Sequence, residues 1–452
     1  RGFYGISSDR NRNEGMAMGS GQKLWERAKE LIPGGSMLLS KKSEMFLPNL
    51  WPAYYSKAKG ISIFDLDGTK YLDFSTMSVG TCSLGYGNES VDEAVTKAVR
   101  DGVMSSLNSP GEVELAGRLV DLHPWAQMAK FARSGGEANA MAVRIARAHT
   151  NRDKIAICGY HGWHDWYLSA NLAEDNSLDG HLLPGLQPLG VPRGLTGTTV
   201  PFDYNDLDYL GDLLSSKDYA AVKMEVSRTF TPKEGFLQGV RELCDSTGTL
   251  LIFDECTSGF RETFGGLHLK YGVDPDLAMF GKALANGYAM SAVIGTRTVM
   301  KAVEKTFISS TFWTERLGPV AALATLDEMQ SIESWRVISE IGDGVKEFWT
   351  NALDNAGLNH TVSGIRPNPD FRIHTDQWLE ARTFIFQEML KKGFLSGSTI
   401  YFSTKHDSNS IAAYRSAFIE ILQVLANAIE NRVDLGSLLE EKRIDNGFQR
   451  LN

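Results

Sequence analysis

The chain has 452 residues, of which 42% are hydrophobic and 22% charged, and its formal net charge is −9. These values are ordinary for a globular protein of two or three domains, and the acidity argues against nucleic-acid binding because no basic stripe offsets it. No apolar run approaches the ~20 residues that span a bilayer, and residues 1–15 lack the apolar core of a signal peptide. The four cysteines lack the spacing of a zinc site or a disulfide framework. We therefore expect a cytoplasmic protein without a membrane partner.

The first 75 residues predict one helix and one β-hairpin. A weak helical pattern over 22–31 ends at a Pro-Gly-Gly sequence. The runs 61–66 and 69–74 flank Asp67-Gly68, a pair typical of a type I′ turn. Residues 75–87 are small and rich in glycine, which indicates a loop that passes beneath a site.

The middle of the chain alternates short apolar runs with helical patterns. A segment with apolar residues on one face follows Glu137 and predicts a helix. Strands that alternate with helices imply a mainly parallel sheet covered by helices on both faces. The runs that predict strands are 128–132, 154–158, 219–226, 250–253, 277–280 and 291–295.

The last third of the chain predicts helices. A long helix begins at Ala321, and apolar residues from 411 to 429 keep helical spacing after a start near Asp407. We therefore predict an α/β fold in three segments. Residues 76–320 form a large domain around the sheet, and residues 1–75 join residues 321–452 in a smaller α+β domain.

An acid and a lysine follow two of the predicted strands. The run 250–253 ends in Asp254, and the run 277–280 is followed by Gly281-Lys282. In open α/β sheets ligands bind at the carboxyl ends of strands, so Asp254 and Lys282 should face one crevice. Pyridoxal phosphate requires this pair, because a lysine bonds to its aldehyde and a carboxylate keeps its ring nitrogen protonated. The alternative is that Asp254 caps a loop and Lys282 is a surface charge.

Two hydroxyl- or glycine-rich segments are candidates for binding a phosphate. Gly135 and Gly136 follow Ser134 at a strand-to-helix junction, where backbone N–H groups and the helix dipole attract anions. The alternative is a plain turn, and the GxGxxG dinucleotide pattern is absent. Residues 309–313 form a hydroxyl cluster with aromatics around Thr311, which could donate to a phosphate or simply start a helix.

Three residues near strand ends are candidates for contact with a planar ring. Tyr160 follows the run 154–158 and could stack on a cofactor, or it could be a buried tyrosine beside a satisfied His161. Cys256 would pack on the other ring face if its strand continues past Asp254. Glu225 lies at the end of the strand within the run 219–226 and could form a hydrogen bond near the cofactor, or cap a loop.

These residues resemble the class III aminotransferases, which are fold type I pyridoxal phosphate enzymes. The likeness is greatest to the branch that holds glutamate-1-semialdehyde aminomutase, and it covers about residues 33–326. The segments that carry it are Leu251 to Glu255, Gly259 to Arg261, Gly265-Gly266, Tyr271 to Val273, Pro275 to Leu277, Gly281-Lys282, Ser134 to Ala138 and Tyr160 to Gly162.

The resemblance implies a role for each site residue. Lys282 is then the lysine that bonds to the cofactor, and Asp254 the partner of its ring nitrogen. Gly135 and Gly136 bind the phosphate, while Tyr160 and Cys256 lie on opposite ring faces, with Cys256 in place of the family's usual valine. The resemblance further implies that Thr311 reaches the phosphate of a neighbouring subunit, which requires a homodimer with composite sites.

Departures from the family bear on the substrate. Lys41 stands where the aminomutase has the arginine of an SPVR run, and an ammonium lacks the fork that binds a carboxylate bidentately. No match to the aminomutase's C-terminal glutamate is evident in residues 396–406. The sequence STFWTERLGP, residues 310–319, resembles transaminases of surface-polysaccharide sugar pathways.

We therefore expect a transaminase that moves an amino group from an amino acid, glutamate, to a keto or aldehyde sugar such as an eight-carbon sugar acid of the amino-Kdo type. Trp163, His164 and Trp313 would contact sugar hydroxyls, or only pack. An aminomutase is the alternative. A nucleotide-binding oxidoreductase is a further alternative, against which the missing GxGxxG counts, and an inactive scaffold would require loss of Lys282 or Asp254.

Overall fold

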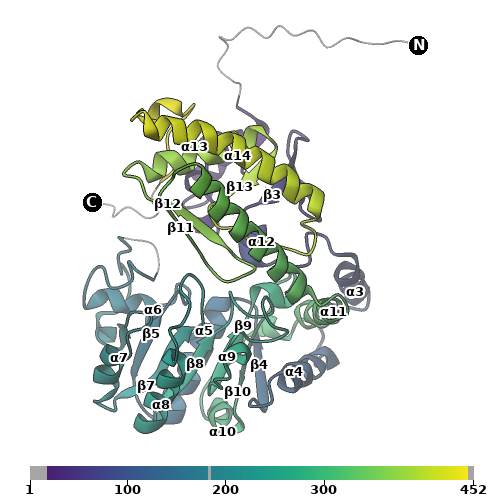
Figure 1. Ribbon diagram of the computed structural model, residues 1–452. Coiled ribbons are helices and arrows are strands. Elements are labelled where there is room, and N and C mark those ends of the chain that lie inside the picture. The colour runs from purple at the N-terminus through teal and green to yellow at the C-terminus, as the bar shows by residue number, and fades with distance from the viewer. Residues whose placement is uncertain (1–17, 182–184, 446–452) are drawn as a thin grey trace.

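A computed structural model describes residues 18–181 and 185–445 of the chain (Figure 1). Its larger part is built on a seven-stranded sheet with the strand order β4-β10-β9-β8-β7-β5-β6. Only β10 in this sheet runs antiparallel to its neighbours; the other pairs are parallel. The strands are β4 (Met128–Ala132), β5 (Lys154–Cys158), β6 (Thr199–Pro201), β7 (Tyr219–Glu225), β8 (Leu250–Asp254), β9 (Leu277–Phe280) and β10 (Ser291–Gly295).

Helices cover both faces of this sheet. On one face, α5 packs its apolar residues against alternate residues of β5, β7, β8, β9 and β10. On the other face, α7 and α8 pack against the residues in between on β5, β7 and β8, and α3, α4 and α11 pack against those on β9 and β10. Because both faces are buried, these strands are continuous apolar runs. The helices of this part are α2 (Met77–Gly80), α3 (Glu89–Arg100), α4 (Pro110–Leu122), α5 (Gly135–Thr150), α6 (Asp165–Leu168), α7 (Leu207–Leu214), α8 (Phe236–Thr247), α9 (His268–Tyr271), α10 (Arg297–Met300) and α11 (Leu317–Ser331).

Segments from both ends of the chain form a smaller part, drawn above the large sheet in Figure 1. Its sheet has the order β1-β2-β3-β13, and β13 pairs in parallel with β3. Residues between Leu47 and Phe74 share one apolar core with residues between Ile338 and Leu435. The elements are α1 (Ser20–Leu31), β1 (Tyr55–Lys59), β2 (Ser62–Asp65), β3 (Lys70–Phe74), α12 (Ser334–Asn355), β11 (His360–Ser363), β12 (Asp370–Ile373), α13 (Trp378–Lys391), β13 (Phe394–Ser396) and α14 (Ser408–Glu430).

The observed elements agree with the predicted α/β fold and correct it in detail. Helix α14 begins after Asp407, whose carboxylate accepts a hydrogen bond from the Ser410 N–H at 2.7 Å, as an N-cap does. Helix α11 begins at Leu317, so the proposed boundary at residue 320 falls inside a helix. The predicted type I′ turn is wrong, because only Gly68 has a positive φ (83°) and that turn needs two such residues.

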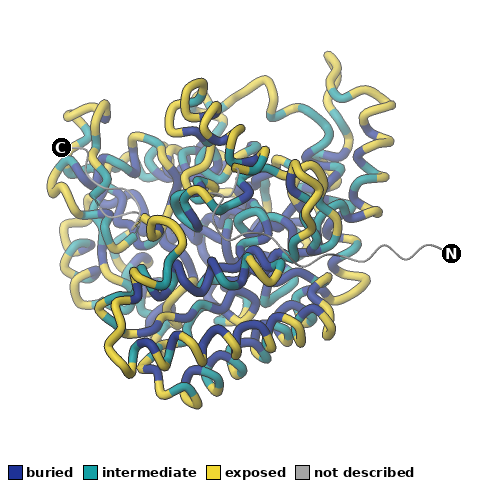
Figure 2. The backbone as a smooth tube through the Cα atoms, turned by 90° about the horizontal axis from the view of Figure 1, so that it is seen from above, coloured by how far each residue is buried: buried dark blue, intermediate teal, exposed yellow. Residues whose placement is uncertain are grey.

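Buried residues gather in the interior of the molecule and exposed residues on its outside, as the dark blue and yellow parts of the tube in Figure 2 show. Across residues 18–181 and 185–445, no helix is long and apolar enough to cross a membrane. Over the same residues, no group of three or more His, Cys, Asp or Glu side chains is arranged to hold a metal ion.

His123 fastens the end of α4 to the loop that connects β8 with β9. Its ring is fully buried, its Nδ1 lies 2.7 Å from the Leu119 carbonyl oxygen, and its Nε2 accepts the Gly266 N–H at 2.9 Å. One ring nitrogen therefore donates and the other accepts, which is the pattern of a neutral imidazole. Burial lowers the pKa of His123 from 6.5 to about 4.

This shift predicts a pH-dependent contribution to stability. Because the folded pKa is lowered, the contribution is complete above about pH 6.5 and is lost as the pH falls towards about 4. Between pH 7 and 5 the loss should be about 2 kcal/mol. Urea unfolding of the wild type and His123→Gln at both pH values would measure it. The wild type should lose about 2 kcal/mol more than the variant, and equal losses would contradict the neutral assignment.

Candidate active site

Asp254 and Lys282 lie at the ends of two adjacent strands. Asp254 is the last residue of β8 and stands opposite Met279 of β9, and Lys282 follows β9 by two residues. The short segment after β8 connects them: the Cys256 N–H donates to Asp254 Oδ1 at 3.0 Å, and Lys282 Nζ donates to Thr257 Oγ1 at 2.7 Å. The structure thus brings the predicted acid and lysine to one edge of the sheet.

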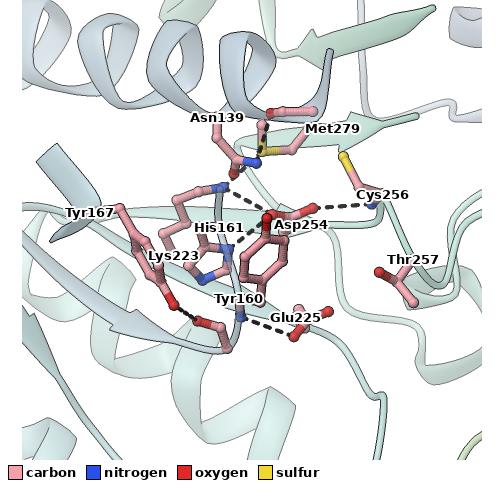
Figure 3. Close-up of polar contacts among 12 residues, drawn as sticks. Asn139, Tyr160, His161, Tyr167, Lys223, Glu225, Asp254, Cys256, Thr257 and Met279 are labelled. Atoms are coloured by element: carbon pink, nitrogen blue, oxygen red, sulfur yellow. Dashed lines mark hydrogen bonds and ion pairs between the residues drawn. The ribbon is translucent and has the colours of Figure 1, made fainter. Parts of the chain in front are cut away.

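Asp254 is an ionised carboxylate in a dry setting. It is 3% exposed, and its Oδ2 lies 2.9 Å from His161 Nδ1 and 3.8 Å from Lys223 Nζ (Figure 3). Burial alone would raise the pKa of Asp254, but the Lys223 charge and the His161 hydrogen bond hold it well below its ordinary value. The carboxylate therefore stays charged at neutral pH and can hold a cationic nitrogen beside it.

The Lys282 amine is less basic than that of an exposed lysine. Burial lowers the pKa of Lys282, Tyr401 counteracts this effect, and the guanidinium groups of Arg228 and Arg261 lower the pKa further. The backbone of Lys282 is also strained, with φ of 44°. A lowered pKa makes the neutral, nucleophilic form of an amine more accessible.

Gly135 and Gly136 begin helix α5. Ser134 is the N-cap in a capping box with Glu137, which fixes the first turn and leaves first-turn N–H groups without helical partners. A Cβ on Gly136 would lie 2.9 Å from the His164 ring, and one on Gly135 would lie 3.4 Å from Cys256 Sγ. A side chain at Gly136 would therefore clash with His164, whereas Gly135 has ordinary contact distance, and the glycine at 136 keeps this turn's amides open to an anion.

The segment from Gly159 to Gly162 lies against the same turn. Tyr160 is 37% exposed, and its N–H donates to Glu225 Oε2 at 3.2 Å. A Cβ on Gly162, which has φ of 98°, would lie 3.1 Å from the Gly136 Cα atom. Figure 3 shows Tyr160 and Glu225 gathered with Asp254 at the strand ends.

Cys256 reaches the site, but a turn orients it rather than the predicted continuation of the strand. Strand β8 ends at Asp254 rather than continuing, so alternation along a strand does not orient Cys256. A turn held by the Asp254 carboxylate does so instead. Its Sγ lies 3.4 Å from the Cβ positions of both Gly135 and Gly281, which places Cys256 between the two loops.

The remaining predicted residues lie farther out. Trp313 Nε1 donates to Glu137 Oε1 at 3.1 Å, at the start of α5. Trp163 is 71% exposed and lines a hollow of about 620 Å³ with His164, Arg144 and Arg147. Lys41 and Thr311 are exposed, and no hydrogen bond or ion pair within the described residues joins either to Asp254 or Lys282. The predicted role of Thr311 in a neighbouring subunit stays a prediction.

Several site residues were not identified from the sequence. The sequence predicts no role for His161 beyond that of a satisfied histidine, and in the structure its Nδ1 lies 2.9 Å from Asp254 Oδ2. Lys223 interrupts the apolar run of β7, and this charge inside a predicted buried strand was a usable signal. Tyr401 comes from the smaller part of the molecule and carried no signal; burial would raise its pKa, but Arg228, Lys282 and Arg261 lower it.

The close approach at Gly162 yields a stability prediction. Gly162→Ala should destabilise the protein by about 1–3 kcal/mol, because the residue must keep a positive φ and its Cβ presses on the Gly136 backbone. Gly117→Ala is the control, since Gly117 lies in α4 with nothing within 4 Å of its Cβ position, and it should be neutral or stabilising. Urea unfolding would measure both, and equal effects would contradict the geometry.

Several known proteins are similar to this chain. Residues 48–368 match the family model described as aminotransferase class-III. The 3-aminobutyryl-CoA aminotransferase of Cloacimonas acidaminovorans is 30% identical over 431 residues, which cover 91% of this chain and 100% of that protein. The glutamate-1-semialdehyde 2,1-aminomutase of Methanothrix thermoacetophila is 31% identical, over 89% of this chain and 96% of its own. A solved structure described as a transaminase with PLP bound has a TM-score of 0.80 and 27% identity, and covers 93% of this chain and 100% of its own.

Proposed function

The chain belongs to the class III aminotransferases, fold type I enzymes that use pyridoxal phosphate, and on this premise we propose that it is a transaminase whose amino donor is glutamate and whose acceptor is a keto or aldehyde sugar. The observation that carries the transaminase proposal is the meeting of the Asp254 carboxylate and the Lys282 amine at adjacent strand ends. An acid that stays ionised and an amine of lowered basicity are the two groups that transamination requires.

Two features of the site fit the cofactor. A Cβ at Gly136 would collide with the His164 ring at the start of α5, so the backbone there is open only with glycine, which suits a backbone cradle for a phosphate. His164 Nδ1, 3.0 Å from the Gly136 Cβ position, is buried without a hydrogen-bond partner in the described structure. Gly135 and Gly136 would hold the phosphate, and Tyr160 and Cys256 would contact the two faces of the ring. Asp254 would pair with the ring nitrogen, and Lys282 would bond to the aldehyde carbon. Glu225 would hold the Tyr160 backbone, whose N–H it accepts at 3.2 Å.

The chain's own residues then divide the work of the reaction. When bound, pyridoxal phosphate supplies a ring that accepts the electron pair left when a bond to the substrate's amine-bearing carbon breaks. Asp254 keeps a cationic nitrogen in place because its carboxylate stays ionised. The Lys282 amine moves a proton to and from that substrate carbon. Thr257, which accepts the Lys282 amine's hydrogen bond at 2.7 Å, orients it.

Arg228 supports an amino acid as the donor. Its guanidinium group is 42% exposed, lies 3.7 Å from Glu225 Oε1, and is close enough to lower the pKa of Lys282. A guanidinium fork near the reacting amine suits the carboxylate of an amino acid. We assign the donor carboxylate to Arg228 rather than to Lys41, which is exposed on a short turn (Leu39–Lys41).

Different observations favour different acceptors. The resemblance of residues 310–319 to sugar transaminases and the exposed Trp163 support a keto or aldehyde sugar, such as an eight-carbon sugar acid used in surface polysaccharides. The relative named 3-aminobutyryl-CoA aminotransferase is matched over its whole length and favours a second candidate, a 3-oxoacyl thioester. The relatives named as aminomutases favour a third, transfer of an amine within one substrate.

The proposal includes a homodimer with composite active sites. Thr311 is exposed and is flanked by Phe307 and Phe312, which are 81% and 69% exposed. Exposed large apolar side chains of this kind are typical of a surface that another protein covers. In such a dimer Thr311 would approach the phosphate held by the partner's glycine turn.

A half-reaction separates these activities. The enzyme loaded with pyridoxal phosphate should release one equivalent of 2-oxoglutarate per site from glutamate, because a transaminase keeps the amine. Its pyridoxamine form should then lose the amine to keto sugars in a panel that also contains 3-oxoacyl thioesters. Consumption of the thioesters alone would replace the sugar with the second acceptor. An enzyme that releases no 2-oxoglutarate but isomerises an amino aldehyde would be an aminomutase.

Replacement of Arg228 should weaken one donor class selectively. Arg228→Met should raise the glutamate concentration needed for half-maximal reaction by about 10- to 100-fold, since a charge-assisted hydrogen bond contributes about 1.5–3 kcal/mol. Reaction with 1-phenylethylamine, which has no carboxylate, should change little. Arg193→Met, at an exposed position, is the matched control. A similar loss for both amines would show that Arg228 does not bind the donor carboxylate.

A further inference from the structure

A fully buried lysine lies beside Asp254. Lys223 is on β7, on the face that α5 covers, and its exposed fraction is 0%. Its Nζ lies 3.8 Å from Asp254 Oδ2 on β8 and 2.7 Å from Met279 Sδ on β9. A lysine ammonium is rarely buried without a paired charge, and the transamination steps described above do not use this one.

The groups around Lys223 provide one carboxylate for it. From α5 it is faced by the neutral Asn139, as Figure 3 shows, and from β9 by Met279. The Asn139 Oδ1 atom is buried without a hydrogen-bond partner in the described structure. Glu225 at the end of β7 also acts on Lys223, but lies next to Arg228. The Cys256 thiol is neutral, because burial and Asp254 raise its pKa well above the ordinary value. Asp254 is therefore the counter-ion of Lys223.

His161 competes with Lys223 for the same carboxylate. Its Nδ1 lies 2.9 Å from Asp254 Oδ2, and its Nε2 lies 3.2 Å from the Cys158 carbonyl oxygen. Both neighbours accept hydrogen bonds, so both contacts are hydrogen bonds only if the ring is a cation. Burial and the Lys223 charge lower the pKa of His161, which keeps the ring neutral with its proton on Nδ1. The charge of Asp254 is then balanced by Lys223.

A protonated ring nitrogen would add a second cation to this dry site. Two cations around one carboxylate leave a net buried charge, which is strongly unfavourable. Buried lysine is the group that adapts most readily, because its pKa falls when it loses a counter-ion in a dry environment. Interacting groups of this kind titrate as one unit.

We propose that Lys223 is a charge-balancing residue: it is the counter-ion of Asp254 until a neutral ring nitrogen reaches that carboxylate, and it then passes one proton to that nitrogen. In the exchange an N–H bond of the Lys223 ammonium breaks and an N–H bond forms on the ring nitrogen, so charge is conserved and no electrons are transferred. The inference rests on the proposed contact between Asp254 and the ring nitrogen. Lys223 is a positioning residue in this account, because it acts through Asp254.

The proposal has a measurable consequence for cofactor binding. In the wild type, Lys223 supplies the proton that a neutral ring nitrogen needs when it binds. Without Lys223 that proton comes from solvent, so binding takes up one more proton per site. Because binding and proton uptake are linked, the variant's affinity for the cofactor depends more steeply on pH than that of the wild type. For each unit by which the pH rises in the mildly alkaline range, the variant's affinity falls by a further factor of about ten relative to the wild type.

Calorimetric titration of the cofactor-free full-length chain with pyridoxamine phosphate tests this, because that form cannot bond to Lys282. Proton exchange is obtained by repeating the titration in buffers of different ionisation enthalpy. Lys223→Met should take up about one more proton per site than the wild type. Lys154→Met, which removes a partly exposed lysine at the start of β5, should match the wild type. Lys223→Gln, which keeps a hydrogen-bond donor without the charge, should behave as Lys223→Met and replaces it if that variant does not fold.

Two outcomes would overturn the proposal, and they are distinguishable. The charge-balancing role would be wrong if the wild type and both Lys223 variants bound the cofactor stoichiometrically and took up the same number of protons per site. The proposed function would be unaffected by that result. Failure of the wild type to bind pyridoxamine phosphate stoichiometrically would overturn both, because the Asp254 site would then not hold the ring.

Discussion

The burial of an ionised carboxylate at Asp254 is the constraint on which the site depends. A charge in a dry place is costly unless it is paired and hydrogen-bonded. Here the Cys256 N–H, the His161 ring and the Lys223 ammonium provide that pairing from three separate segments. The parallel order β7-β8-β9 makes it possible, because it brings the ends of these strands to one edge of the sheet.

The two parts of the molecule meet around Lys282. The larger part supplies Lys282 and Thr257, whereas Tyr401 comes from the segment between β13 and α14. The guanidinium carbon of Arg261 lies 5.2 Å from the Tyr401 ring centroid, so it links the two parts beside the amine. Some of the chain's backbone strain lies here, in the positive φ angles of residues 77–79 and of Lys282. Strain of this kind persists where surrounding contacts hold it, which suits a site that must position one amine.

The sequence predicts most of the large sheet, because strands buried on both faces are continuous apolar runs with abrupt polar ends. Asp254 and Lys282 could be singled out for the same reason. The reversal of β10 was not predictable, since apolar runs carry no information on direction. Tyr401 was missed because only tertiary structure brings it to Lys282, and Lys223 was passed over although a charge within a buried run was visible. The identity of the amino-group acceptor depends on side chains around the opening of the site, and the spacing of apolar residues in the sequence does not predict where those side chains lie.

We propose that Asp254 and Lys282 hold one cofactor between them. The most direct test is borohydride reduction of the enzyme loaded with pyridoxal phosphate, followed by peptide mass analysis. We expect the yellow colour to bleach and the mass of one reduced cofactor to appear on the peptide that contains Lys282, and Lys282→Ala should gain no label there. Label on a peptide that contains another lysine, or no label in the wild type, would contradict the central claim.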